Sequence, residues 1–372
     1  MSETILNYNT KLDQSDMRGA ITEFPNQIKK SFSIMNNWVP YKKYQNIQYI
    51  MVLGMGGSAI GGDVARVLAQ NACTVPVFVN RSYNIPEWVG LNTLILASSY
   101  SGGTEETLSA FALCRERNCP IIVLSTGGII TDYAGEYDLD KITIPGGYQP
   151  RAALGFSFSL ILILLSRLGF VENKIIEMVE KSIDLLESLS TEMNKNENKA
   201  LTFAENIHTT CPIIYGSEEL TWVAALRFRG QLAENAKMLS FHHHFPEQNH
   251  NEIEGWTVNP DIMKRFSIIW IKDEDDHPGT QARMRISSTL LESIAGSQLE
   301  VSQPGANRVE RLLKLIHYTD WISYYSALLN NVDPTPVKRI QKIKIKILEE
   351  RQSLIVWSDE KYVNYHYEFS RS

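Results

Sequence analysis

Cysteine is scarce in this sequence of 372 residues, and its four cysteines form no CxxC pair. A disulfide framework and a cysteine-based zinc site are therefore not indicated, and a reducing compartment fits best. Excess positive charge is also missing, because 36 Lys and Arg stand against 42 Asp and Glu and leave a net charge of -6. A broad nucleic-acid-binding surface needs clustered Lys and Arg, so any anion must be bound locally.

Long apolar segments are missing as well. The longest apolar run, from about Phe156 to Leu165, is too short to span a bilayer. The segment from Met1 to Asn9 is polar and lacks the apolar core of a signal peptide. We expect a cytoplasmic protein with neither membrane nor nucleic acid as a partner.

The chain is too long for one ordinary hydrophobic core, and its length predicts two domains. Short apolar runs rich in Val and Ile alternate with helical patterns, which is typical of α/β domains with a mainly parallel sheet flanked by helices in three layers, as in flavodoxin-like folds. The predicted divisions are a helical lead-in (1–45), a phosphate-binding α/β domain (46–170), a linker helix (171–200), a second α/β domain (201–335), and a C-terminal helix and tail (336–372).

The predicted strands follow from these apolar runs. They are residues 48–53, 75–79, 93–97 and 121–124 in the first domain, and residues 212–215, 266–271 and 299–302 in the second. Helices are predicted at 172–198, 221–237, 281–294 and 337–354.

A glycine-rich turn, Gly54–Asp63 (GMGGSAIGGD), follows the first predicted strand directly. In a parallel sheet such a turn presents backbone N–H groups at the start of a helix, which favours an anion near Gly57 and Ser58. The spacing G-x-G-x-x-A also satisfies the dinucleotide fingerprint. The second strand, however, ends in Asn80-Arg81 instead of an acidic residue, and no Gly-Lys-Ser/Thr follows as in a Walker loop.

A loop rich in hydroxyl groups, residues 98–107 (SSYSGGTEET), follows the third predicted strand. Ser99, Ser101 and Thr104 can each donate a hydrogen bond to a phosphate oxygen, and the glycines let backbone N–H groups approach closely. The alternative is a helix N-cap, with Thr104 and two Glu residues beginning the next helix. Two such loops on one sheet favour a phosphate site.

GMGGSAIGGD and SYSGGTEETL resemble the motifs of sugar isomerase (SIS) domains. Together with QPRAALG and PEQNHNEIEG they resemble the bifunctional phosphoglucose/phosphomannose isomerases of archaea and some bacteria, in family order from about Gln48 to Leu348. The resemblance implies two SIS domains and an aldose-ketose isomerase. Such an enzyme interconverts glucose 6-phosphate, and mannose 6-phosphate, with fructose 6-phosphate through ring opening and a cis-enediol, without a cofactor or metal. Gly103 stands where the family commonly has Asn.

The resemblance also implies catalytic roles. Glu234 would carry the proton between C1 and C2, His250 would open the sugar ring, and Arg151 would stabilise the enediol oxyanion. The family implies a homodimer in which His250 is supplied across the interface.

A lysine of the C-terminal helix is also expected near the sugar. We choose Lys344, although Lys342 and Lys346 alternate with Ile in the same way.

Each of these residues has an interpretation without function. Glu234 could be an exposed helix carboxylate paired with Lys237, His250 a solvated loop histidine, and Arg151 a surface residue opening a helix. The histidines at 242–244 raise a metal site as a further alternative, but consecutive histidines cannot all face one ion, and no HExxH motif is present.

Two other functions compete with the isomerase. A non-catalytic sugar-phosphate sensor built on SIS domains usually carries a DNA-binding module, and none is visible. A different SIS enzyme would lack Glu234 and His250 in these motifs.

Overall fold

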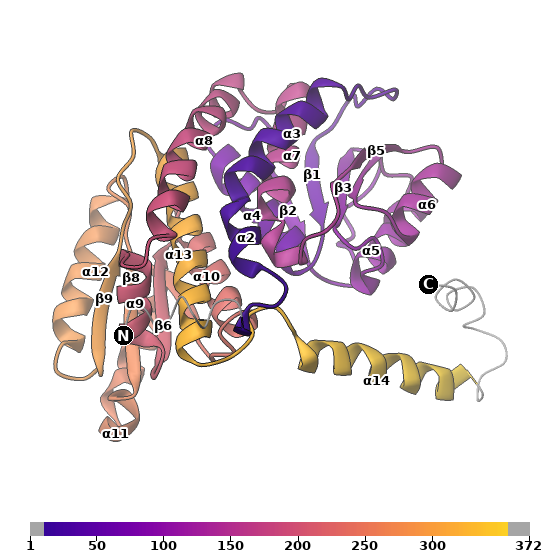
Figure 1. Cartoon of the computed structure of the whole chain (residues 1–372). Coiled ribbons are helices and arrows are strands. Elements are labelled where there is room, and N and C mark those ends of the chain that lie inside the picture. The colour runs from indigo at the N-terminus through magenta and orange to yellow at the C-terminus, as the bar shows by residue number, and fades with distance from the viewer. Residues whose placement is uncertain (1–10, 356–372) are drawn as a thin grey trace. The chain divides into compact units, whose positions relative to one another are not determined.

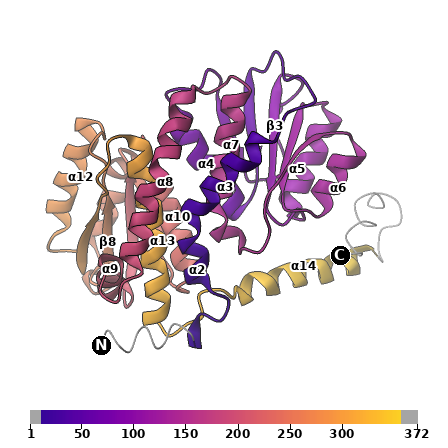
Figure 2. The ribbon, with the colours of Figure 1, turned by 45° about the horizontal axis from the view of Figure 1, so that its top comes forward.

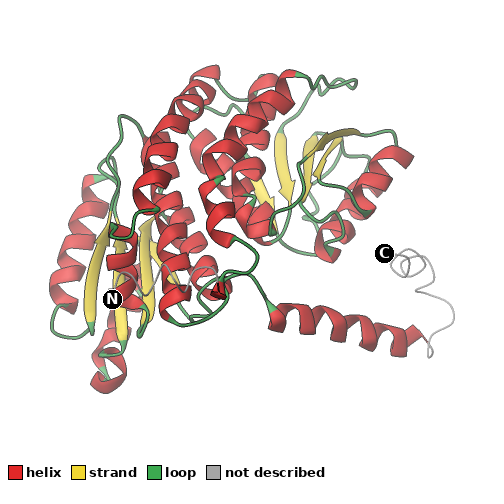
Figure 3. Ribbon diagram, in the orientation of Figure 1, coloured by secondary structure: helices red, strands yellow, loops and turns green. Residues whose placement is uncertain are grey.

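The computed structural model describes residues 11–355, with side chains for residues 11–350. The start of the predicted lead-in (1–10) and the end of the predicted tail (356–372) lie outside these residues. The chain divides into two compact units, Met1–Pro334 and Thr335–Ser372. The first unit holds both sheets, and the second holds helix α14 (Lys338–Ile355) (Figures 1 and 3).

The first sheet has five parallel strands in the order β2-β1-β3-β4-β5. They are β1 (Tyr49–Leu53), β2 (Val77–Asn80), β3 (Thr93–Ser99), β4 (Ile121–Ser125) and β5 (Asp140–Thr143). Helices α4 (Gly56–Ala69) and α7 (Leu154–Arg167) lie on one face, and α5 (Glu105–Glu116) and α6 (Ile129–Glu136) lie on the other (Figures 1 and 2). The prediction lacks β5, a strand that includes the charged residues Asp140 and Lys141.

The second sheet has four parallel strands in the order β7-β6-β8-β9. They are β6 (Cys211–Ser217), β7 (Phe241–Phe245), β8 (Phe266–Ile271) and β9 (Ser297–Val301). This order repeats that of the first four strands of the first sheet, so β6 corresponds to β1 and β8 to β3. The α/β class with two parallel sheets is confirmed, and the histidines at 242–244 form part of an edge strand.

The remaining elements of the described chain are mostly helices. They are α2 (Met17–Thr22), α3 (Phe24–Asn36), η1 (Pro150–Ala152), α8 (Asn173–Met193), α9 (Lys199–Ile207), α10 (Trp222–Glu234), η2 (Glu247–His250), η3 (Glu252–Thr257), α11 (Pro260–Met263), α12 (Pro278–Leu291) and α13 (Arg308–Leu329). Pro25 stands in the first turn of α3, where a missing N–H costs no hydrogen bond, so it starts a new helix after α2. No helix among residues 11–355 is long and apolar enough to cross a membrane.

One hydrophobic core joins the two sheets. Ile50 and Leu94 of the first sheet belong to the same buried cluster as Ile214 and Ile269 of the second. The buried helix α13 contributes to this cluster and packs against α8, α9 and α10. The predicted domain boundaries stay a prediction, and the shared core shows that the sheets form one compact unit.

Candidate active site

The hydroxyl loop lies at the carboxyl end of β3. The hydroxyl of Thr104 lies 3.4 Å from that of Ser99 and 3.4 Å from that of Ser101. Thr104 occupies the N-cap position of α5, but its side chain makes no capping hydrogen bond. The three hydroxyl groups therefore gather at the start of a helix, where backbone N–H groups also point outward.

The glycine turn lies beside this loop, at the start of α4. The backbone N–H of Tyr100 donates to the hydroxyl of the buried Ser58 over 3.2 Å. Gly56 has a φ of 48°, a left-handed conformation that favours glycine. The structure thus brings together the two loops that the sequence predicts as one phosphate site.

Two glycines of these loops differ in what surrounds them. Gly102 has a φ of 70°, and a Cβ there would lie 1.7 Å from the carbonyl oxygen of Gly127. Gly103 has open space around it. The departure from the family at Gly103 is therefore not imposed by packing.

Gly57 connects the glycine turn to Arg151. A Cβ at Gly57 would lie 2.4 Å from the carbonyl oxygen of Pro150, so the absence of a side chain lets η1 approach α4. Arg151 follows on η1, and only 4% of its side chain is exposed. The alternative of a surface arginine is therefore wrong.

The guanidinium of Arg151 is held on three sides. Its Nε donates to the Asn235 side chain over 2.7 Å, and its Nη2 donates to the carbonyl of Pro334 over 2.8 Å. Its Nη1 lies 3.4 Å from the carboxylate of Glu234. Burial lowers the pKa of Arg151, although the Glu234 carboxylate opposes this effect. The cation stays charged because an arginine pKa lies far above neutral pH.

Glu234 is the last residue of α10, and its side chain is 32% exposed. Its ion pair is with Arg151. Lys237 donates instead to the backbone carbonyl of Glu234, over 2.5 Å. The structure therefore joins two residues that stand 83 positions apart in the sequence, and it leaves the carboxylate partly open to solvent.

A buried network that the sequence analysis missed supports this pair. Arg227 of α10 makes two hydrogen bonds to Asp320 of α13, over 2.9 and 2.6 Å, and its Nη2 also donates to the carbonyl of Arg151 over 2.9 Å. Gln231 donates to the same Asp320. Asn235, which holds Arg151, donates in turn to Ser323. The sequence motifs could not predict these contacts, because Asp320 and Ser323 lie on α13, a helix outside the motifs.

His250 lies elsewhere, at the end of η2, with an exposed side chain. It has no hydrogen-bond or ion-pair partner among residues 11–350. Exposed apolar side chains lie in the same stretch of chain, namely Leu239, Phe241, Val258 and Ile262. Within the described residues, His250 is not in contact with Glu234 or Arg151.

Lys344 lies on α14 with an exposed side chain, as do Lys342 and Lys346. The helix belongs to the second compact unit, and the choice among the three lysines stays a prediction.

The histidine strand β7 has its own contacts. His244 lies 3.1 Å from the carboxylate of Glu218, and burial lowers the pKa of His242 to about 4. In the described part of the chain, no group of three or more His, Cys, Asp or Glu side chains is placed to hold a metal ion.

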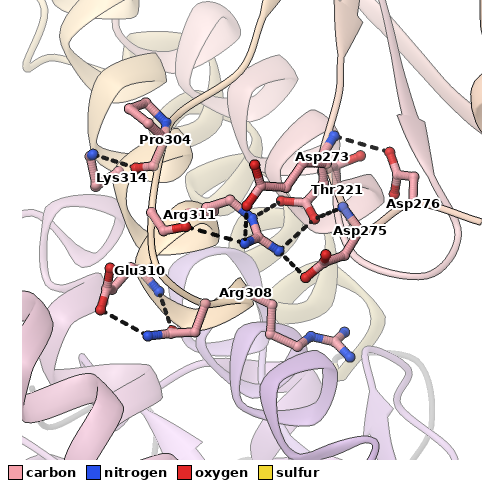
Figure 4. A network of polar contacts seen from close by, with 12 residues as sticks. Thr221, Asp273, Asp275, Asp276, Pro304, Arg308, Glu310, Arg311 and Lys314 are labelled. Atoms are coloured by element: carbon pink, nitrogen blue, oxygen red, sulfur yellow. Dashed lines mark hydrogen bonds and ion pairs between the residues drawn. The ribbon is translucent and has the colours of Figure 1, made fainter.

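The carboxyl end of β8 corresponds to the hydroxyl loop, but it carries acidic residues (Figure 4). Arg311 of α13 donates to both oxygens of Asp273, over 2.7 and 3.0 Å, and also contacts Glu274 and Asp275. Both Arg311 and Asp273 are buried. Burial raises the pKa of the neighbouring Asp276 to about 6. The guanidinium of Arg311 therefore occupies this end of the second sheet.

The chain matches the family described as bacterial phospho-glucose isomerase C-terminal SIS domain over residues 196–347. It is also similar to curated relatives named bifunctional phosphoglucose/phosphomannose isomerase. The relative from Caldicellulosiruptor bescii is 39% identical over 333 residues, which cover 89% of this chain and 98% of the relative. The relative from Aquifex aeolicus is 34% identical over 312 residues, which cover 84% of this chain and 92% of the relative.

Solved structures share the fold at low sequence identity. The C-terminal domain of glucosamine-fructose-6-phosphate aminotransferase from Francisella tularensis has a TM-score of 0.63 and 15% identity, covering 85% of this chain and 97% of that chain. Tagatose-6-phosphate ketose/aldose isomerase from Escherichia coli has a TM-score of 0.60 and 16% identity, covering 85% of this chain and 91% of that chain. At these identities the likeness shows the fold alone.

Proposed function

Because the chain belongs to the family of bifunctional phosphoglucose/phosphomannose isomerases, we propose that it interconverts glucose 6-phosphate and mannose 6-phosphate with fructose 6-phosphate. The observation that carries the proposal is the contact between Arg151 and Glu234, which places a buried cation 3.4 Å from a partly open carboxylate. An aldose-ketose isomerisation needs this combination, because a base moves a proton while negative charge develops on the neighbouring oxygen.

The substrate phosphate is proposed to bind between the two loops. Ser99, Ser101 and Thr104 supply hydroxyl donors, and the turn at Gly57 and Ser58 supplies backbone N–H groups at the start of α4. This site holds the phosphate before and during reaction alike, so it contributes to substrate binding more than to the rate of the chemical step.

Glu234 is proposed as the base that moves the proton between C1 and C2 of the open-chain sugar. Arg151 stabilises the enediolate oxygen, and its three hydrogen-bonding directions keep it from swinging toward solvent. The reaction oxidises one carbon and reduces its neighbour within the same molecule. It therefore needs no external redox cofactor.

Ring opening is assigned to His250, in a homodimer in which this residue serves the site of the partner subunit. Support comes from the exposed position of His250, which has no partner among residues 11–350, and from the exposed apolar residues Leu239, Phe241, Val258 and Ile262 in the same stretch. Lys344 is proposed to lie near the sugar ring. The cytoplasmic location stays a prediction from the sequence.

The test is a coupled assay of the purified chain with glucose 6-phosphate and mannose 6-phosphate. Glu234→Gln should lower kcat by at least about a thousandfold and leave fructose 6-phosphate binding measurable, because the amide keeps the shape but accepts no proton. Glu205→Gln, at an exposed carboxylate on α9, is the control and should keep full activity.

Two outcomes would contradict the proposal. Near-normal activity of Glu234→Gln would show that another group is the base. An inactive wild-type chain that still binds fructose 6-phosphate would favour a non-catalytic sensor.

A further inference from the structure

Lys237 stands three residues after the proposed base in an unfavourable backbone conformation. Its φ is 58°, a left-handed conformation that is best tolerated by Gly, Asn and Asp. A lysine in such a conformation suggests that contacts of its side chain compensate for the backbone strain.

The side chain of Lys237 turns back toward the end of α10. Its ammonium donates to the backbone carbonyl of Glu234 over 2.5 Å and to the carbonyl of Pro334 over 3.2 Å. The last carbonyls of a helix lack partners within the helix and carry partial negative charge. A cation at this place fixes the end of the helix that bears Glu234 and offsets the negative potential next to its carboxylate.

The Pro334 carbonyl is shared. Arg151 donates to the same oxygen over 2.8 Å, and a carbonyl oxygen has two lone pairs, so both cations bind it. Lys237 is thus connected to Glu234 directly and to Arg151 through one bridging carbonyl.

We propose that Lys237 is a positioning residue of the active site, whose ammonium caps α10 at Glu234 and holds the Pro334 carbonyl that orients the Arg151 guanidinium. This inference rests on the proposed function, because it assigns Lys237 to the reaction of Glu234 and Arg151. Lys237 acts through these two residues and is not assigned a contact with the substrate.

The proposal has a consequence for pH dependence. Burial of the ammonium, followed by the nearby Arg151 guanidinium, lowers the pKa of Lys237 to about 8, against the opposing effect of the Asp333 and Glu234 carboxylates. The charged form makes the contacts. Activity should therefore be present below about pH 8 and fall above it as the ammonium loses its proton.

The experiment compares Lys237→Met, Lys237→Arg and Lys264→Met in the full chain. Met keeps the length of the stem and faces the same backbone cost, so it removes mainly the ammonium. Lys264 is a matched control, because its ammonium also donates to two backbone carbonyls, those of Ser293 (2.7 Å) and Ala295 (3.4 Å), outside the proposed site.

We expect Lys237→Met to lower kcat about tenfold while KM changes less than about threefold, because the phosphate loops are separate from Lys237. The fall in activity near pH 8 should disappear in this variant and move to higher pH in Lys237→Arg, which should recover most of the rate. Lys264→Met should keep the wild-type kcat, KM and pH profile.

Several results would overturn the inference. A kcat of Lys237→Met within twofold of wild type, or a loss equal to that in Lys264→Met, would show a structural role only. If Lys237→Met does not fold, the wild-type profile decides, since a flat kcat from pH 7 to 9.5 contradicts the proposal. A wild-type chain without isomerase activity would instead contradict the proposed function.

Discussion

The carboxyl ends of β3 and β8 occupy equivalent places in two sheets of the same strand order, yet they carry opposite chemistry. After β3, the hydroxyls of Ser99, Ser101 and Thr104 gather at the start of a helix with glycines between them. After β8, a run of acidic residues closes around the guanidinium of Arg311 (Figure 4). The carboxyl end of either strand can therefore carry a site for charged groups. The side chains determine whether the charged group is a proposed ligand, as after β3, or a side chain of the protein, as after β8.

The difference supports placing the proposed phosphate site at the first sheet and not at the second. A phosphate near the buried Asp273 and Asp276 would meet carboxylates at close range, and the repulsion between like charges is unfavourable. At the first sheet the hydroxyls of Ser99, Ser101 and Thr104 are neutral hydrogen-bond donors, which suit an anion. The two sheets therefore share a strand order but not the side chains of the proposed phosphate site.

The largest effect is expected at Arg311. Arg311→Met leaves the buried Asp273 without its cation, which should lower the free energy of unfolding by about 3–5 kcal/mol. Urea unfolding measures this loss. The control is Lys314→Met on the same helix, because Lys314 donates to the carbonyl of Pro304, away from Asp273, and should cost about 1 kcal/mol. Equal losses would show that the carboxylates are not what Arg311 stabilises.

An intermediate effect is expected at Thr104. Thr104→Ala removes a hydroxyl donor from the charged phosphate, and KM should rise about ten- to a hundredfold with kcat nearly unchanged. The matched control is Thr280→Ala, at the start of α12 after the acidic loop, which should leave KM at its wild-type value. An equal fall in kcat and kcat/KM for Thr104→Ala would speak against a role in binding alone.

The smallest effect is expected at Asp276, whose pKa burial raises to about 6. Because the pKa is higher in the folded state, protonated Asp276 stabilises the fold. This stabilisation is complete below the unfolded-state pKa near 3.8 and is lost as the pH rises through about 6. Asp276→Asn should therefore gain about 1–2 kcal/mol over wild type between pH 4 and pH 7. Unfolding curves at these two pH values measure the gain, and a constant difference would contradict the assignment.

Much of the fold is visible in the sequence because its strands are short, apolar and followed by glycine or hydroxyl-rich turns. The predicted runs at 48–53, 93–97 and 266–271 coincide closely with β1, β3 and β8. The loop residues Ser58, Ser99 and Thr104 follow from the same pattern, because parallel strands place the turns at their carboxyl ends on one edge of the sheet.

Helix α13 shows where prediction from the apolar pattern fails. It is buried on nearly all sides, so its sequence shows no single apolar stripe. Its buried polar residues pair with residues that lie far away in the sequence. Asp320 pairs with Arg227, and His317 contacts the hydroxyl of Ser190 over 2.6 Å. Burial also lowers the pKa of His317 to about 3, which keeps the ring neutral.

The contact between Arg151 and Glu234 is a second example. No periodicity connects Arg151 with Glu234, because their contact depends on packing between η1 and the end of α10. Only the resemblance of motifs placed both residues in one site. Asn235 and Lys237 stand next to Glu234 in the sequence, but their contacts to Arg151 and Pro334 become visible in three dimensions.

The close approach at Gly57 has a consequence for which sugars fit. Because no side chain separates Gly57 from Pro150, the turn of the proposed phosphate site lies directly against the residue before Arg151. In the proposed mechanism, the distance between the phosphate site and Arg151 is therefore set by a backbone contact, which adjusts less than a flexible side chain would. We therefore expect the proposed site to select sugar phosphates by the number of carbons between the phosphate and the carbonyl group.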